Sequence, residues 1–323
     1  MLDRLRRREP TSDDPARDPA APPPPQDEGT LRSLLVANAY RNVQPSVTAT
    51  GYRSFPLRFR AAGERAWSEP AEEFLTASRL GRHDRAARES AQSYFHDDAI
   101  ELLARVDLEA CGAGAVPLPR ADQLDAPLTA VVAARRSCRD FAADPIELRT
   151  LATILAGCAG VTDEQAISRS DGVDAPMSVR AAPSAGGLYP IETYVLAQRV
   201  DDLPPATYRY LPRTHELTAH VAFASPADLS VAAADAEHLG QAAVLLLFVV
   251  RPWRSMRKYG PRGLRFAFLE AGAMTQGVHL AACALGLGSL DCGSLCDDEA
   301  HRVLGLDGTY AALVHSVLVG ARA

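Results

Sequence analysis

The chain reads AAVLLLFVVRPWRSMRKYGPRGLRFAFLEAGAMTQGVHLAACALGLGS from residue 242 to residue 289, and its architecture follows from this stretch. The first nine residues are all apolar, which is typical of a short central strand that is buried on both faces. Residues 264–285 then carry apolar side chains at helical spacing and predict a long buried helix. A buried strand followed by a buried helix indicates helices packed on a central sheet.

The chain on either side of this stretch adds further helices and strands in a mixed order. Asp125, Pro127, Asp144 and Pro145 are typical helix-start residues. Helices are expected at residues 127–136 and 145–160, and strands at residues 192–200, 207–211, 215–221 and 313–320. Because helices and strands do not alternate strictly, we expect an α+β fold with a central antiparallel or mixed sheet flanked by helices.

Composition changes along the chain predict three regions. Residues 1–30 are rich in proline, aspartate and arginine, and we expect a disordered tail there. Residues 31–121 form an N-terminal extension that is partly helical, with helical spacing at residues 70–106. Prolines at 117, 119 and 127 indicate a linker, so the main domain is expected at residues 122–323.

Charge and residue counts exclude several classes of function. With a net charge of −6, the chain lacks the basic face that nucleic-acid binding favours. No run of 18 apolar residues predicts a membrane span, and the N-terminus has no apolar core of a signal peptide. The six cysteines show no zinc spacing and the eight histidines no HExxH motif. We therefore expect a cytoplasmic protein with reduced thiols and no metal.

Lys258 is the only lysine in a chain that holds 34 lysine and arginine residues together. Arginine keeps its proton, whereas a buried lysine can lose its own and act as a base. Two glycines and a proline predict that residues 257–263 form a loop. Arg257 and Arg262 are expected to lower the pKa of Lys258 by repulsion, and Tyr259 can exchange a proton beside it. The alternative is that one lysine remains by chance.

Three other segments suit a ligand. RRSCR at 135–139 gathers three arginines and a hydroxyl, a set that matches a phosphate dianion, although an ordinary basic helix end also explains it. PSAGGLYP at 183–190 lets backbone N–H groups approach a planar ligand, although glycine pairs also precede many strands. GLGSLDCGS at 286–294 ends a helix and then offers backbone donors; a helix cap followed by a loop explains part of it.

Together these segments resemble the SagB/ThcOx-type azoline dehydrogenases of the nitroreductase superfamily. The resemblance rests on RRSCRDF at 135–141, PSAGGLYPIETYV at 183–195, KYG at 258–260, residues 265–289 and VLGLDG at 303–308. It covers roughly residues 122–320 and implies a nitroreductase-like α+β fold. It also implies a homodimer that holds one FMN at each end of its interface.

The resemblance further implies a role for each matching residue. Lys258 and Tyr259 correspond to the catalytic pair of the subgroup. Arg135, Arg136 and Ser137 would bind the FMN phosphate, with Arg322 as a further cation, and Arg139 would face the N1/O2 edge of the flavin. The remaining residues would line the ring: Ser184, Ala185, Gly186, Gly187, Leu188, Gly293 and Ser294.

The activity implied is oxidation of thiazoline or oxazoline rings to aromatic azoles in a ribosomally made precursor peptide. A cyclodehydratase complex would then supply the cyclised, azoline-containing peptide, and oxygen would reoxidise the flavin. Two alternatives stay open. One is an NAD(P)H-dependent nitroreductase-like enzyme acting on a small molecule, and the other is an inactive scaffold subunit of a peptide-modifying complex.

Overall fold

The structure is a computed structural model that describes residues 44–45, 52–53, 70–82, 84–93, 96, 98–99, 114–220, 228–229, 232–233 and 236–323. The chain forms two compact units, residues 1–69 and residues 70–323. In the first unit the described strands are β1 (Gln44–Pro45) and β2 (Tyr52–Arg53), which pair antiparallel. The tail predicted for residues 1–30 and the helical spacing at residues 100–106 lie outside the described residues.

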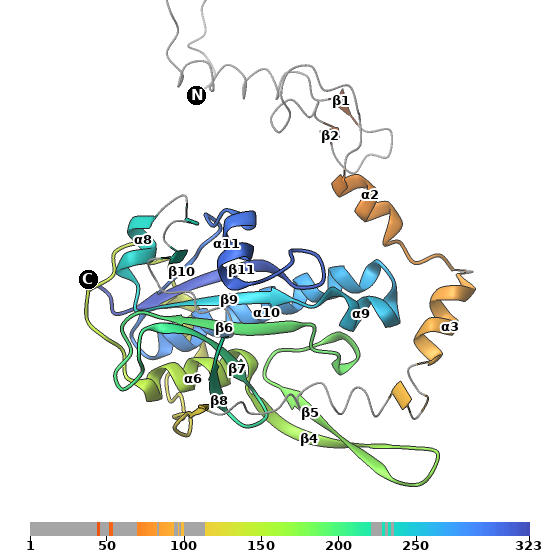
Figure 1. Ribbon diagram of the computed structural model, residues 1–323, viewed down its shortest axis with the longest axis horizontal. Helices are drawn as coiled ribbons and strands as arrows, with labels where there is room; N and C mark the ends of the chain where they lie inside the picture. The colour runs from red at the N-terminus through yellow and green to blue at the C-terminus, as the bar shows by residue number, and fades with distance from the viewer. Residues whose placement is uncertain are drawn as a thin grey trace, which may run out of the picture. The chain divides into compact units, whose positions relative to one another are not determined.

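The second unit is built on a seven-stranded sheet in which all neighbouring strands run antiparallel (Figure 1). This confirms the central antiparallel sheet predicted from the sequence. Its order is β10 (Gly288–Asp291), β11 (Ala312–Gly320), β9 (Val244–Val250), β6 (Ile191–Ala197), β7 (Ala206–Leu211), β8 (Glu216–Ala219) and β3 (Val116–Pro117). Strand β3 precedes the domain start expected at residue 122, so the sheet also takes in chain that the sequence indicates as linker.

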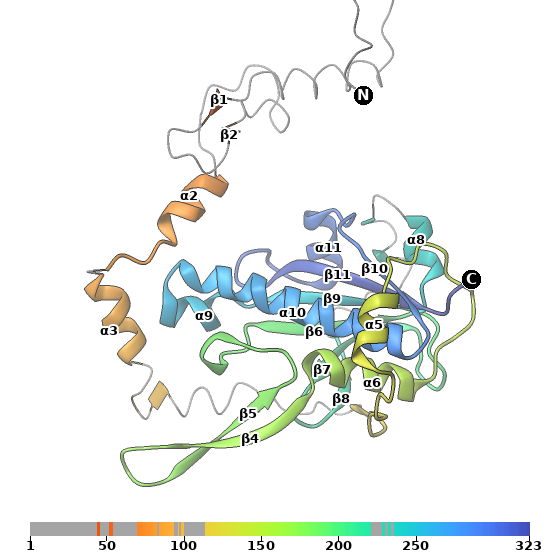
Figure 2. The same ribbon diagram turned by 180° about the vertical axis from the view of Figure 1, so that it is seen from behind.

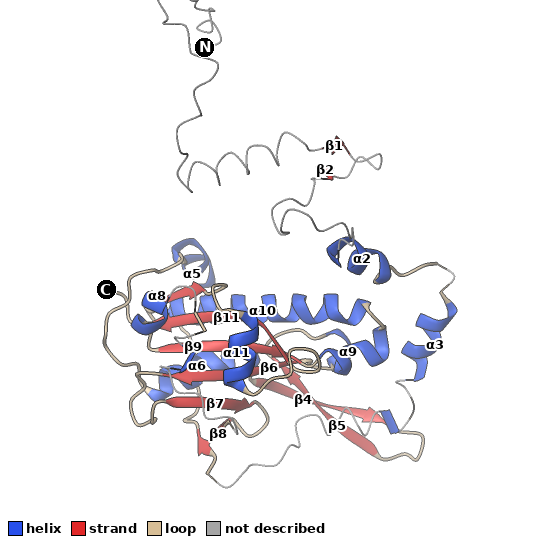
Figure 3. Cartoon of the chain, turned by 45° about the horizontal axis from the view of Figure 1, so that its top comes forward, coloured by secondary structure: helices blue, strands red, loops and turns tan. Residues whose placement is uncertain are grey.

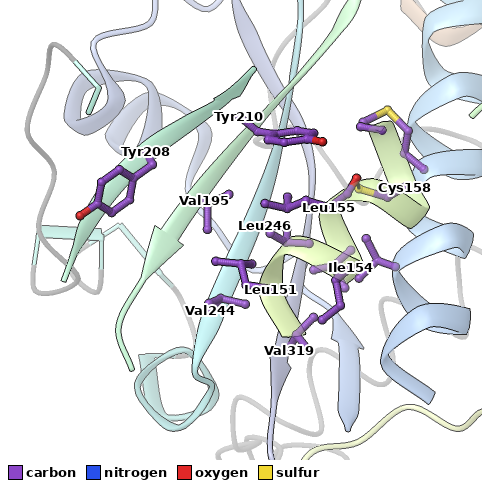
Figure 4. Close-up of a cluster of buried hydrophobic side chains, with 14 of the residues drawn as sticks. Leu151, Ile154, Leu155, Cys158, Val195, Tyr208, Tyr210, Val244, Leu246 and Val319 are labelled. Atoms are coloured by element: carbon purple, nitrogen blue, oxygen red, sulfur yellow. Dashed lines mark hydrogen bonds between the residues drawn. The ribbon is translucent and has the colours of Figure 1, made fainter. Parts of the chain in front are cut away.

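Strand β9 is buried along its whole length, as predicted, and separates two hydrophobic cores. Val244, Leu246 and Phe248 face a core formed with helices α6 (Leu148–Ala159) and α10 (Arg262–Ala284). Leu245 and Leu247 face the other core, formed with α8 (Ala236–Gln241) and α11 (Asp297–Leu304). Helices therefore cover both faces of the sheet (Figures 1 and 2). Figure 4 shows how α6 packs on the sheet, with Leu151 and Leu155 beside Val195 and Leu246.

The helices predicted after residue 125 are present with small shifts in their bounds. Helix α5 (Leu128–Ala134) ends just before Arg135, and α6 begins at Leu148, a few residues later than expected. Helix α10 ends where the glycines predicted, because Gly286 has a φ of 76° and the Leu287 N–H donates to the Ala282 carbonyl.

A two-stranded hairpin outside the main sheet was not predicted. Strands β4 (Val161–Ser168) and β5 (Asp174–Arg180) pair along their length and extend away from the sheet (Figure 3). β4 is mostly exposed and its sequence, VTDEQAIS, has no regular apolar alternation, so it lacks the strand signature. The hairpin leads directly into the glycine-rich segment, where residues 185–187 form a 3₁₀ turn, η1.

The loop predicted at residues 257–263 was wrong at both ends, because helix α9 (Pro252–Tyr259) extends into it and α10 begins at Arg262. Helix α9 contains Lys258 and Tyr259 in its last turn. Pro252 stands at the first helical position, where proline is favoured, and no helix breaker follows until Gly260, whose φ is 57°. Two helices of the N-terminal extension, α2 (Pro70–Ala77) and α3 (Arg85–Ser93), belong to the same compact unit.

Candidate active site

The glycine-rich turn and the lysine–tyrosine pair, far apart in sequence, lie against each other. A Cβ atom built on Gly186 would be 2.7 Å from the Tyr259 hydroxyl oxygen and 3.0 Å from Lys258 Nζ. Gly186 also has a φ of 67°, in the left-handed region that disfavours side chains. Both the backbone conformation and the close contact therefore require glycine at this position.

Lys258 and Tyr259 are both shifted toward their neutral forms. The Lys258 side chain is buried, with 9% of its surface exposed, and this burial lowers the pKa of its amine. The direction agrees with the sequence prediction, but burial rather than repulsion from Arg257 and Arg262 is the cause. Burial also raises the pKa of Tyr259, so its phenol keeps its proton at neutral pH. The pair thus combines a more easily neutralised amine with a protonated phenol.

A buried ion-pair cluster fixes helix α9 to the sheet. Glu192, on β6, lies 2.5 Å from Arg254, 3.0 Å from Arg251 and 3.2 Å from Arg209. Burial raises the pKa of Glu192, but the three arginines outweigh it and lower the pKa below its usual value. Arg254 also donates to the Tyr189 carbonyl at 3.4 Å, and it lies one helical turn before Lys258. This cluster links the sheet, the glycine-rich segment and the helix that carries Lys258.

The N-terminal extension contacts the other side of the same helix. Ser90, on α3, donates to the carbonyl oxygens of Arg257 at 3.0 Å and Lys258 at 3.1 Å, which are acceptors at the end of α9. Between these helices lies a cavity of about 270 Å³ that Tyr259 helps to line. The other lining residues are Ala77, Ser78, Arg79, Leu80, Asp84, Ser90, Met256, Gly260, Pro261 and Arg262. Sequence reasoning assigned no role to Ser90, because nothing local to residue 90 indicates its distant partner.

A second acid, Glu270, lies beneath the glycine-rich segment. It is on α10 with 3% of its surface exposed, and its Oε1 accepts a hydrogen bond from Ile191 N at 3.3 Å. The Ser184 hydroxyl also bonds the carboxyl, while Ser184 Oγ accepts from Tyr189 N at 2.9 Å. Burial raises the pKa of Glu270 to about 7, and these bonds offset only part of that rise. The sequence around residue 270 gives this acid no predicted function.

The predicted phosphate residues gather at the opposite end of the sheet. Cys138 N donates to Ser289 O at 2.9 Å, which places the basic segment beside the start of β10. The backbone of Arg322 forms an isolated antiparallel β-bridge with Phe141, and Arg322 Nε donates to Leu287 O at 3.0 Å. Arg322 therefore lies beside the basic segment. Within the described part of the chain, no carboxylate pairs with Arg135, Arg136, Arg139 or Arg322. Neighbouring cations without a counter-charge fit the phosphate of FMN.

The structure therefore divides the predicted site residues into separate groups. Through the strand register, Ser289 is level with Ala197 on β6, whereas the glycine-rich segment joins β6 at Ile191. At about 3.3 Å per residue, these points are about 20 Å apart along the strand. Gly293 and Ser294 follow β10, where Ser294 Oγ lies 3.6 Å from Cys292 Sγ.

The remaining ring-lining candidates have different environments. Leu188 is almost fully buried, so its side chain belongs to the protein interior. Ala185 and Gly187 stay partly exposed on the turn, and a Cβ on Gly187 would lie 2.9 Å from Met177 Sδ. Ser184 is also partly exposed and connects the turn to Glu270.

The described residues offer neither a metal site nor a membrane-spanning helix. The described residues contain no group of three or more histidine, cysteine, aspartate or glutamate side chains arranged to hold a metal ion. In the same part of the chain, no helix has the length and apolar character needed to cross a membrane.

Comparison with known proteins identifies relatives of the main domain. A family model described as the nitroreductase family matches residues 132–321. "Putative nitroreductase MJ1384" of Methanocaldococcus jannaschii is 31% identical over 189 residues, 58% of this chain and 88% of that protein. The microcin B17-processing protein McbC of Escherichia coli is 33% identical over 147 residues, 43% of this chain. That match spans 54% of McbC, about half its length.

Solved structures share the fold of the main domain. A crystal structure described as a "putative nitroreductase" from Ralstonia eutropha JMP134 is 28% identical with a TM-score of 0.53, covering 66% of this chain and 93% of that chain. One chain of the E. coli microcin synthetase McbBCD complex with truncated pro-MccB17 is 18% identical with a TM-score of 0.51. It covers 75% of this chain and 100% of that chain. At this identity the likeness concerns the fold alone, and it confirms the nitroreductase-like fold.

Proposed function

Because the chain belongs to the nitroreductase family of oxidoreductases, we propose that it is an FMN-dependent dehydrogenase of azoline rings. Its substrate is a ribosomally made peptide that carries thiazolines or oxazolines, and its products are thiazoles or oxazoles. Each ring loses two hydrogens, one as a hydride and the other as a proton. FMN, when bound, supplies the acceptor for the hydride.

The observation that carries the proposal is the contact of Gly186 with Lys258 and Tyr259. A base is needed for the proton that leaves the ring, and an amine whose pKa is lowered by burial is suited to accept it at neutral pH. Tyr259 keeps its phenolic proton and can hydrogen-bond the ring heteroatom or relay a proton. Because Gly186 has no side chain, the glycine-rich segment can lie directly against Lys258 and Tyr259.

The basic group supports the cofactor assignment. Arg135, Arg136 and Ser137 would hold the FMN phosphate, with Arg322 beside them, and Arg139 would face the ring. Arginine suits this role because its planar guanidinium binds phosphate oxygens in pairs. The lysine–tyrosine pair lies at the other end of the sheet, so a second copy of the chain is proposed to bring the two groups together. Gly293 and Ser294 are proposed to approach the ring from the end of β10.

Proposed partners follow from the likeness to McbC. McbC is named a microcin B17-processing protein, and it is 33% identical to residues of this chain over the matched stretch. A fold neighbour belongs to a microcin synthetase complex with a truncated precursor bound. We therefore propose that this protein acts on an azoline-containing precursor peptide and works with a cyclodehydratase complex.

The test is to incubate purified Lys258→Ala, loaded with FMN, with an azoline peptide and measure the peptide mass. Loss of two hydrogens per ring should occur with the wild type and fall by about 100-fold or more in the variant, since general-base contributions are of that size. Arg257→Ala is the matched control, because it removes the neighbouring cation of α9 and should retain activity. Unchanged ring oxidation by Lys258→Ala with FMN bound would exclude Lys258 as the base.

A second candidate is an NAD(P)H-dependent reductase of small molecules. It is favoured by the match to the M. jannaschii protein, which is named a nitroreductase and is covered over 88% of its length. Adding NADPH without peptide distinguishes the two functions. Rapid bleaching of the flavin absorbance would support the reductase, whereas bleaching only by azoline peptide would support the dehydrogenase.

A further inference from the structure

Glu270 is a buried acid that forms hydrogen bonds with both ends of the glycine-rich segment. Ile191 N, at the end of the segment, donates to Glu270 Oε1 at 3.3 Å. Ser184, at its start, hydrogen-bonds the same carboxyl and also accepts the N–H of Tyr189 at 2.9 Å. One carboxyl group therefore joins both ends of the segment that contains Gly186.

We propose that Glu270 is a positioning residue: its carboxyl holds residues 184–191 in place, and its protonation state changes how Gly186 lies against Lys258 and Tyr259. The inference uses the contact on which the proposed function also rests. It does not depend on the identity of the substrate or on a bound flavin.

The ionised and protonated forms of Glu270 differ in how well they hold the segment. A carboxylate accepts hydrogen bonds from both Ile191 N and Ser184, and charge-assisted bonds are stronger than neutral ones. Glu270 Oε2 is buried and makes no hydrogen bond within the described residues, so it is the oxygen that can take up a proton. Protonation therefore weakens the two bonds without supplying a new partner.

Weakening of these two hydrogen bonds would change the position of Gly186. Gly186 and Gly187 follow Ser184 after one intervening residue, Ala185, and glycines change conformation more readily than other residues. The amine of Lys258 and the hydroxyl of Tyr259 lie against Gly186, so a shift of the turn changes their surroundings. The link is mechanical and short, because only Ala185 and Gly186 stand between Ser184 and Gly187.

The charged groups around Glu270 come from several elements. Arg180, on β5, and Arg254, on α9, both lower the pKa of Glu270, but burial exceeds their effect and leaves the pKa at about 7. Arg254 is held by Glu192, and the Arg180 guanidinium lies 4.3 Å from the centre of the Tyr189 ring. Glu270 therefore changes charge within the neutral range.

The single lysine gives a direct measurement. An amine-selective acylating reagent labels only Lys258 and the chain's amino terminus, and mass spectrometry of peptides separates the two. The labelling rate of Lys258 is measured over a pH series with the full-length protein. In the wild type, the plot of labelling rate against pH should deviate near pH 7 from the curve of a single ionisation, because the charge of Glu270 alters the surroundings of the amine. Glu270→Gln should lose this departure and follow one ionisation.

Two further variants make the result decisive. Ser184→Ala removes the bond at one end of the segment and should also abolish the departure near pH 7. Thr275→Val changes another buried polar residue of α10 without affecting the segment, and it should retain the wild-type curve. A wild type with one simple ionisation, or a Glu270→Gln curve identical to the wild type, overturns the inference.

The outcome is separate from that of the proposed function. If azoline peptides are never oxidised but labelling of Lys258 shows the transition that Glu270→Gln removes, the positioning role stands and the proposed function fails. If azoline oxidation occurs and the transition is absent, only the positioning role of Glu270 fails.

Discussion

Gly186 is the residue on which the geometry of the candidate site most depends. Replacing it with alanine would place a Cβ 2.7 Å from the Tyr259 hydroxyl oxygen and 3.0 Å from Lys258 Nζ. We expect Gly186→Ala to lower the rate of azoline oxidation by roughly 100-fold, as small misplacements of catalytic groups do. The measurement is kcat with saturating peptide and bound FMN.

Gly172 provides a matched control for the backbone strain in that experiment. It has a φ of 77°, close to that of Gly186, but an added Cβ would meet nothing within 4 Å. Both alanine variants should lose about 1–2 kcal/mol of stability from the left-handed conformation. Equal activities of Gly172→Ala and Gly186→Ala would contradict the role of the contact.

The raised pKa of Glu270 predicts how the free energy of unfolding depends on pH. Its pKa rises from 4.5 to about 7 on folding, so the native state binds more protons between these values. The contribution of Glu270 to stability is therefore fully present below pH 4.5 and is lost as the pH rises through about 7. Glu270→Gln should be more stable than the wild type by roughly 3 kcal/mol at pH 8 and equal to it at pH 4.5. Thermal melts at both pH values check this, and an equal difference at both would refute it.

Among the elements, helix α9 is joined to the sheet by one carboxylate that pairs with Arg254 and with the N-cap residue of the helix, Arg251. Glu192→Gln leaves Arg254, Arg251 and Arg209 without their shared counter-charge, and breaking a buried ion pair typically costs about 3–5 kcal/mol. The pKa of Glu192 is lowered in the fold, so this contribution is present above pH 4.5 and is lost as the pH falls through the folded pKa. Urea unfolding at neutral and acid pH measures both effects.

An exposed ion pair serves as the comparison for that variant. Glu299 and Arg302 are 3.9 Å apart on α11 and largely exposed to solvent. Glu299→Gln should change stability by less than about 1 kcal/mol at either pH. If Glu192→Gln cost no more than Glu299→Gln, α9 would not be anchored by this cluster.

The elements also show which features the sequence could predict. β9 and α10 were predictable because their apolar patterns are strong and local. The end of α10 was predictable because glycine readily adopts the left-handed conformation that follows the last turn of a helix. Hairpin β4–β5 lacks such a pattern, and α9 is a polar helix that contacts Glu192 and Ser90. Both partners are distant in sequence, so no window around residue 258 reveals them.

In the molecule as a whole, the basic segment and the lysine–tyrosine pair lie at opposite ends of the sheet. The motifs were recognisable one by one, and the contact between Gly186 and Lys258 joins two of them. The basic segment, however, lies beside β10 at the far end of the sheet. Pattern reasoning could name the residues but could not tell which of them share one subunit's site, because that depends on packing across the whole chain.

Mixing two inactive variants tests how these groups combine. Arg135→Ala removes the phosphate side, and Lys258→Ala removes the amine. In the proposed homodimer each site takes its phosphate side from one subunit and its amine from the other. A mixed dimer then contains one intact site and one site with both changes. Since half of the randomly formed dimers are mixed, about a quarter of the wild-type activity should return after the variants are unfolded and refolded together. Refolding each variant alone should restore none. If both groups serve one site within a single chain, every site in the mixture carries a change, and no activity returns.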